Sequence, residues 1–154
     1  MDILKASEVF EIAIKIEENG EAFYRKTANK GDKQFKQIFE WLADEEVKHK
    51  ATFEKMLSKV EDYKPAESYP GEYFAYMRSY ADRLIFTPDK LEKEISKIAD
   101  KNDAIEFAIQ REIESILYYI EVKSLVPEGQ RGEIDKIINE ERRHYLKLVD
   151  LKKH

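Results

Sequence analysis

Apolar residues recur at steps of three and four along four long stretches of the chain, a spacing typical of helices with one buried face. We predict helices over residues 7–29, 32–63, 103–126 and 132–152. The intervening residues 64–102 contain Thr87 and Pro88, a favourable N-cap and first-turn pair, and predict two short helices. The pattern therefore predicts an all-α four-helix bundle with a long crossover between its second and third helices.

The two histidine-containing helices carry related sequences. DEEVKH at residues 44–49 returns as NEERRH at residues 139–144, ninety-five residues later. The same offset aligns Glu17 of the first predicted helix with Glu112 of the third. Self-similarity at a fixed offset indicates an internal repeat. We interpret the chain as a duplicated helix pair, residues 7–63 and 103–152, joined by the crossover at 64–102.

Glutamate and histidine occupy positions in the apolar stripes where a helix normally faces the core. These inward residues are Glu17, Glu46, His49, Glu112, Glu141 and His144. The four carboxylates need compensation, because an unpaired buried charge costs several kcal/mol and the inward stripes contain no Lys or Arg. Two divalent cations would balance the charge, and residues three apart on a helix can reach one metal. We therefore predict a dinuclear metal site.

The composition narrows the classes of partner and ligand. A length of 154 residues suits one domain, residues 1–154. The net charge of −5 provides no basic field for nucleic acid or anionic lipid, and no apolar run approaches membrane-spanning length. The chain has no cysteine, so any metal must be bound by nitrogen and oxygen. The N-terminal residues lack the pattern of a secretory signal, and we expect a cytoplasmic protein.

At the six inward residues the sequence resembles the ferritin-like di-iron carboxylate proteins, especially bacterioferritins and the erythrin domain of rubrerythrins without its rubredoxin domain. The resemblance implies a ferritin-like four-helix bundle that binds two iron ions, with manganese or zinc as substitutes. By this resemblance, the terminal ligands are Glu17 and Glu112. The bridging ligands are Glu46 and Glu141. One histidine binds each metal, and these are His49 and His144. It implies no catalytic residue beyond the metal ligands and no organic cofactor.

Further contacts are expected around the ligands. The resemblance pairs Glu45 with His144 and Glu140 with His49, although both glutamates could equally be surface residues. Tyr24 and Tyr119 lie two turns beyond their ligand glutamates on the same stripe. Their hydroxyls could donate hydrogen bonds to ligand carboxylates, and packing alone would also explain them.

Two departures from rubrerythrins affect the expected function. Rubrerythrins usually carry an extra glutamate three residues after the ligand of the third helix, where this chain has Ser115. This weakens the transfer of their peroxide-reducing mechanism. A rubredoxin domain is also missing from the sequence, so electrons are expected from a separate protein such as a rubredoxin or a flavoprotein.

These patterns favour a non-haem di-iron oxidoreductase that reduces hydrogen peroxide or dioxygen with electrons from two Fe(II) ions. The alternative is an iron-binding or storage protein of bacterioferritin type, whose centre acts as a ferroxidase. A metal-free helical interaction module is a third hypothesis, which metal analysis would decide. A homodimer is the usual assembly for this architecture, and neither nucleic acid nor a membrane is expected as a partner.

Overall fold

The computed structural model describes residues 5–60 and 71–153, and all regular structure within these ranges is helical. The α-helices are α1 (Ala6–Thr27), α2 (Lys33–Lys59), α3 (Gly71–Leu84), α4 (Pro88–Ser96), α5 (Lys101–Val122) and α6 (Arg131–Lys152). Short 3-10 turns lie at Ala28–Lys30, Lys123–Leu125 and Glu128–Gln130. The predicted all-α fold is confirmed, and α3 and α4 are the two short helices expected in the crossover.

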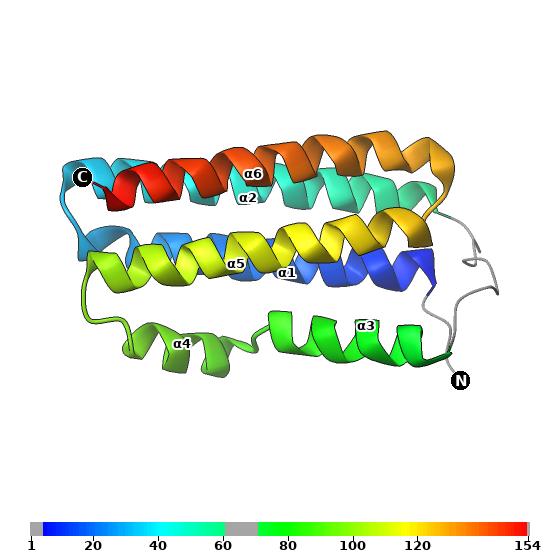
Figure 1. Cartoon of the computed structure of the whole chain (residues 1–154), viewed down its shortest axis with the longest axis horizontal. Coiled ribbons are helices and arrows are strands. Elements are labelled where there is room, and N and C mark those ends of the chain that lie inside the picture. The colour runs from blue at the N-terminus through cyan, green and yellow to red at the C-terminus, as the bar shows by residue number, and fades with distance from the viewer. Residues whose placement is uncertain (1–4, 61–70, 154) are drawn as a thin grey trace.

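The helices form three layers (Figure 1). Helices α2 and α6 make one layer and α1 and α5 the next, with α1 packed on α2 and α5 on α6. Helices α3 and α4 follow the outer face of the α1–α5 layer from one end of the bundle to the other. The crossover therefore separates α2 from α5 in the chain and lets them run in the same direction.

Helix ends differ from the predicted ones where local hydrogen bonds decide the boundary. Helix α5 begins at Lys101 because the Asp100 side chain accepts a hydrogen bond from the backbone N–H of Asp103, at 2.9 Å. It ends at Val122, where a 3-10 turn replaces the predicted continuation to residue 126. Similarly, α1 ends at Thr27 rather than at residue 29.

The end of α2 and the start of α4 can also be compared with the prediction. Helix α2 ends at Lys59, and residues 61–63 of its predicted span lie outside the described residues. Helix α4 begins as predicted, since the Thr87 hydroxyl oxygen accepts the backbone N–H of Lys90 at 3.2 Å and Pro88 occupies the first turn.

The apolar core consists of two clusters, one toward each end of the bundle. The first includes Phe10 and Phe53 together with side chains of α3. The second includes Phe39 and Leu148 together with side chains of α4. The predicted inward glutamates and histidines belong to neither cluster, although they are buried. The fold thus isolates a polar layer within an apolar interior.

Among the described helices, none has both the length and the apolar character needed to cross a lipid bilayer.

Candidate metal centre

All of the predicted ligand residues are buried, with exposed fractions between 1% and 5%. Helices α1 and α5 each contribute one glutamate, and α2 and α6 each contribute a Glu-x-x-His pair. The residues are Glu17, Glu46, His49, Glu112, Glu141 and His144. The helical period explains this convergence, because each of them continues a stripe of buried apolar side chains along its own helix.

The six residues form two overlapping groups whose potential ligand atoms lie within 4.8 Å of one another. Each group contains three glutamates and one histidine, namely Glu17, Glu46, Glu141 and His49 in one and Glu46, Glu112, Glu141 and His144 in the other. The two groups share Glu46 and Glu141, the residues that the resemblance assigns as bridging ligands. This arrangement suits two neighbouring metal ions held by common carboxylates.

Both histidines direct Nδ1 toward the carboxylates. In His49, Nδ1 lies 2.9 Å from Oε1 of Glu141 and 3.6 Å from Oε2 of Glu17. In His144, Nδ1 lies 3.6 Å from Oε2 of Glu141 and 3.7 Å from Oε1 of Glu112. The two rings are nearly parallel, with centroids 5.5 Å apart. Nδ1 is therefore the nitrogen of each ring that faces the candidate metal positions.

Two tyrosines hold the terminal carboxylates from across the bundle. The Tyr24 hydroxyl donates a hydrogen bond to Oε1 of Glu112 at 2.6 Å, and the Tyr119 hydroxyl donates one to Oε1 of Glu17 at 2.5 Å. Each bond joins α1 to α5. The two bonds are equivalent in the internal repeat, because the ninety-five-residue offset aligns Tyr24 with Tyr119 and Glu17 with Glu112. The expected tyrosine–carboxylate hydrogen bonds are present, and each leaves one oxygen of its carboxylate for another partner.

The two predicted outer glutamates take different positions. Oε2 of Glu140 lies 2.6 Å from Nε2 of His49, while the Glu140 side chain is 42% exposed, so it connects this ring to solvent. A carboxylate oxygen of Glu45 lies within 4.8 Å of a ring nitrogen of each histidine. Oε1 of Glu45 also lies 3.6 Å from Nζ of Lys48. The ring of Trp41 packs edge-on against His144 with centroids 5.3 Å apart, a contact that the sequence pattern did not indicate.

Burial and mutual repulsion perturb the carboxyl groups strongly. Burial and the charges of Glu17 and Glu141 raise the pKa of Glu46 well above its usual range. Burial and the charge of Glu141 do the same to the pKa of Glu112. Glu141 is the exception: its burial is outweighed by interactions with Glu112, His144 and His49, which lower its pKa. Without metal, Glu141 is thus the ionised centre of the cluster.

The pKa values of both histidines are raised, although burial alone would lower them. Burial would lower the pKa of His49, but the charge of Glu17 and the hydrogen bond to Glu141 raise it to about 12. The interactions of His144 with Glu112 and Glu141 likewise outweigh its burial and raise its pKa to about 10. At neutral pH the metal-free cluster therefore holds protons on both rings, and a metal ion must displace them in order to bind.

Within the cluster, three buried polar atoms have no hydrogen-bond partner among the described residues: Oε2 of Glu17, Oε2 of Glu112 and Nδ1 of His144. Such atoms are uncommon in a folded interior and require an explanation. Each belongs to one of the two groups described above and carries a lone pair suited to a metal when deprotonated. A mixed set of carboxylates and imidazoles is also chemically suited to iron, manganese or zinc. The residues present therefore fit a pair of divalent ions.

The model of the rubrerythrin family matches residues 8–152. This chain belongs to the rubrerythrin family. A crystal structure from Thermotoga maritima, of a protein described provisionally as a ferritin-like diiron-carboxylate protein, is similar over 100% of this chain and 98% of that chain. The two share 27% sequence identity with a TM-score of 0.69, and the chain has a ferritin-like fold. No curated protein sequence matches it significantly.

Two small residues of this rubrerythrin-family chain lie close to the carboxylates. A Cβ at Gly20 would lie 2.9 Å from both Cδ and Oε2 of Glu46, so the glycine leaves space for that carboxylate. Ser115, which stands where rubrerythrins usually have another glutamate, lines a cavity of about 10 Å³ together with Gly20, Glu46 and Glu112. This volume matches a single water-sized molecule beside the cluster.

One buried cation near the cluster was not predicted from the sequence. Arg111 is 8% exposed and precedes Glu112, outside the inward stripe. Its Nη1 donates a hydrogen bond to the carbonyl oxygen of Leu84, at 2.6 Å, and its side chain borders the small cavity beside Glu46. The burial comes from α3 and the α3–α4 link, which cover this flank of α5. Ala104 and Tyr118, seven residues to either side of Arg111, are apolar and buried as well, and this spacing was the available sequence signal.

Proposed function

We propose that this protein is a di-iron oxidoreductase of rubrerythrin type, which reduces hydrogen peroxide or dioxygen at a carboxylate-bridged centre of two irons. The observation that carries this proposal is the pair of buried ligand groups that share Glu46 and Glu141. Membership of the rubrerythrin family supports it independently.

The proposed ligands are Glu17, Glu46, His49, Glu112, Glu141 and His144. When bound in the ferrous state, two irons supply two electrons, which together with two protons convert hydrogen peroxide to two molecules of water. Four ionised carboxylates and two neutral imidazoles neutralise two divalent ions, which removes the charge repulsion within the cluster.

The protein's own groups orient the ligands and handle protons. The hydroxyls of Tyr24 and Tyr119 fix one oxygen of Glu112 and of Glu17, which leaves the second oxygen of each free to bind metal. Glu140 contacts both solvent and Nε2 of His49, so it orients the ring with Nδ1 inward and offers protons a route toward the centre. The two apolar clusters cover the centre toward both ends of the bundle.

The electron donor in this proposal is a separate protein, such as a rubredoxin or a flavoprotein, because the chain has no cysteine to hold a rubredoxin-type iron. Manganese or zinc could occupy the same donor set, but zinc would not support the redox reaction.

An anaerobic Fe(II) titration followed by mixing with peroxide or dioxygen tests the proposal. We expect binding to saturate at about two irons per chain, the number that this ligand arrangement holds. We also expect faster oxidation by peroxide than by dioxygen, with no mineral formed. Glu46→Ala should abolish the spectroscopic signal of coupled irons, whereas Glu40→Ala, at an exposed position on the same helix, should preserve it.

Two results would contradict the proposal. Uptake that continues to hundreds of irons per assembly would identify an iron store of bacterioferritin type. Failure of the purified protein to bind Fe(II) at all would favour a metal-free interaction module.

A further inference from the structure

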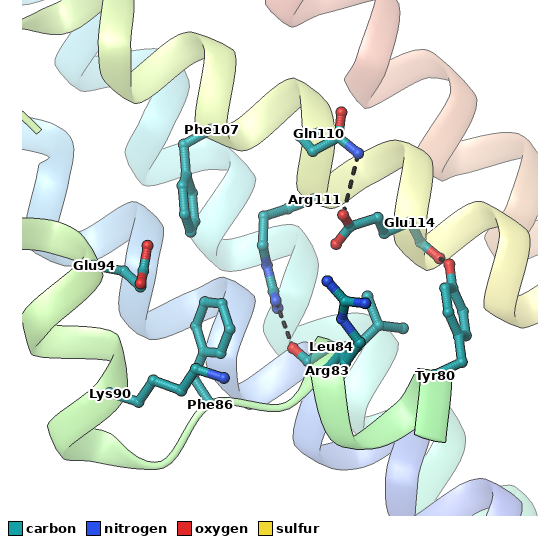
Figure 2. A pocket seen from close by; sticks show the side chains of 10 residues that line it. All are labelled: Tyr80, Arg83, Leu84, Phe86, Lys90, Glu94, Phe107, Gln110, Arg111 and Glu114. Atoms are coloured by element: carbon teal, nitrogen blue, oxygen red, sulfur yellow. Dashed lines mark hydrogen bonds between the residues drawn. The ribbon is translucent and has the colours of Figure 1, made fainter. Parts of the chain in front are cut away.

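A second cavity, of about 450 Å³, lies between the α3–α4 link and α5 (Figure 2). Its walls combine three aromatic rings with three cationic side chains. These are Tyr80, Phe86 and Phe107, and Arg83, Lys90 and Arg111. The volume is in the range of about 300–1,000 Å³ that is typical of small-molecule sites.

The cations of this cavity lack acidic partners. Within residues 5–60 and 71–153, none of Arg83, Lys90 and Arg111 forms an ion pair. Lys90 and Arg111 both contact the ring of Phe86, with Nζ and Cζ respectively 5.0 and 5.2 Å from its centroid. Arg111 is more than nine-tenths buried, and the hydrogen bond of its guanidinium group to Leu84 goes to a neutral carbonyl oxygen rather than to a carboxylate.

The two acidic residues in the cavity wall already have other partners. Oε1 of Glu94 lies 3.1 Å from Nζ of Lys97, and Oε1 of Glu114 accepts a hydrogen bond from the Gln110 side chain at 3.1 Å. Figure 2 shows this contact between Gln110 and Glu114, two neighbouring side chains of α5. The wall thus carries three cationic side chains against two acidic ones, and one of those acids is paired with Lys97 outside the wall, which leaves an excess of positive charge in the cavity.

Hydrogen bonds from neighbouring helices hold the cavity in shape. The Asn19 side chain binds the Phe86 backbone twice, as acceptor from its N–H at 2.6 Å and as donor to its carbonyl at 3.0 Å. Arg111 holds the carbonyl of Leu84, and the Tyr80 hydroxyl donates to the backbone carbonyl of Glu114 at 2.7 Å. The α3–α4 link is therefore tied to both α1 and α5, and the binding surface exists before a ligand arrives.

We propose that this cavity binds a small organic anion, namely a carboxylate or phosphate attached to a planar ring. The anionic group would lie against the guanidinium groups of Arg83 and Arg111 and the ammonium group of Lys90. The planar group would pack on the rings of Phe86 and Phe107, which are themselves 6.3 Å apart between centroids. This site is distinct from the metal ligands and does not depend on the proposed oxidoreductase function.

Titration of the metal-free full-length protein with simple probes tests the site. The two anionic probes are benzoate and phenyl phosphate, with inorganic phosphate and benzyl alcohol as controls that each lack one half of the recognised chemistry. We expect saturable binding of at least one anionic probe at one site per chain, about tenfold tighter than either control. Calorimetry provides the affinity, and the amide signals of Phe86 and Arg111 in NMR spectra locate the site.

Charge variants distinguish specific recognition from general attraction. Arg83→Gln and Lys90→Gln should each weaken binding of the tighter probe by about fivefold to tenfold. Lys93→Gln removes the same charge from the exposed side of α4, outside the cavity wall, and should leave the affinity within about twofold. All three positions are exposed, so folding is not at risk.

The proposal is overturned by equal binding of benzyl alcohol and the anions, by non-saturating shifts spread over the surface, or by equal weakening in Lys93→Gln and Lys90→Gln.

Discussion

The α1–α2 pair and the α5–α6 pair bring equivalent side chains to the interior, but the two histidines have different neighbours. His49 contacts Glu141 through Nδ1 and Glu140 through Nε2. Nδ1 of His144 has no hydrogen-bond partner among the described residues, and its ring packs against Trp41. A duplicated sequence pattern thus reproduces the ligand set without reproducing the surroundings that set each ligand's charge and orientation.

The shared glutamates show the same divergence. Burial and neighbouring carboxylates raise the pKa of Glu46, while interactions with Glu112 and both histidines lower the pKa of Glu141 despite its burial. In the metal-free protein, Glu46 is therefore the protonated member of the pair and Glu141 the ionised one. Both are expected to be ionised when two metals are bound.

The largest expected effect is the pH dependence of the stability of the metal-free protein, to which the histidines of both helix pairs contribute. The folded-state pKa values of about 12 for His49 and about 10 for His144 lie above the ordinary value of 6.5. The stabilisation from these protons is complete below pH 6.5 and is lost as pH rises through the folded values. The raised pKa values of Glu46 and Glu112 act in the same direction.

We therefore expect the metal-free protein to lose up to about 1.4 kcal/mol of stability per pH unit for each histidine above pH 6.5. The metal-loaded protein, whose imidazoles are already neutral, should lack this loss. Scanning calorimetry between pH 6 and 9, with and without Zn(II), measures both curves. A metal-free melting temperature that stays constant across this interval would contradict the raised histidine pKa values.

The next comparison is between the two shared glutamates. Glu141→Gln should destabilise the metal-free protein by about 3 kcal/mol, because it removes the ionised carboxylate that interacts with both buried imidazolium groups. Glu46→Gln should cost less than about 1 kcal/mol, since a neutral amide replaces a carboxyl group that is already protonated. Urea unfolding at pH 7 measures both changes, with Glu40→Gln on the exposed side of α2 as the control. Equal losses would show that the two glutamates have the same charge state.

The outer glutamates provide a smaller contrast. Glu140→Gln should weaken metal binding by about tenfold to a hundredfold, because Glu140 orients His49 through Nε2. Glu45→Gln should have a weaker effect, since the Glu45 carboxylate is shared with Lys48. Competition with a chromophoric chelator measures both affinities. A greater loss in Glu45→Gln would reverse the assigned order.

The smallest effect is expected where the two halves carry different small residues. Gly20→Ala places a Cβ against the Glu46 carboxyl group and should lower metal affinity, while Ser115→Ala should leave it nearly unchanged. Folding stability is a poor reporter, because the gain of about 1 kcal/mol in helix propensity offsets the crowding. Metal affinity from the same chelator competition is the informative measurement. An unchanged affinity in Gly20→Ala would mean that Glu46 moves aside freely.

The sequence by itself determined the helices and the identity of the inward polar residues. Both follow from a local property, since the helical period assigns each residue to a face before any partner is known. For that reason the burial of Glu46 and His49 on α2, and of their counterparts on α6, could be predicted. The absence of inward Lys or Arg then indicated metal ions, because buried carboxylates require compensation.

Only the tertiary structure decided which groups meet. The hydrogen bond from Tyr24 to Glu112 joins residues far apart in the chain, and the sequence pattern offered packing as an equal explanation for the tyrosine. The unequal charge states of Glu46 and Glu141 depend on which neighbours approach each carboxylate. Arg111 is buried because other helices cover the flank of α5 beside its inward stripe. Helical periodicity records which way a side chain points, whereas burial, charge and binding depend on what the rest of the chain places opposite it.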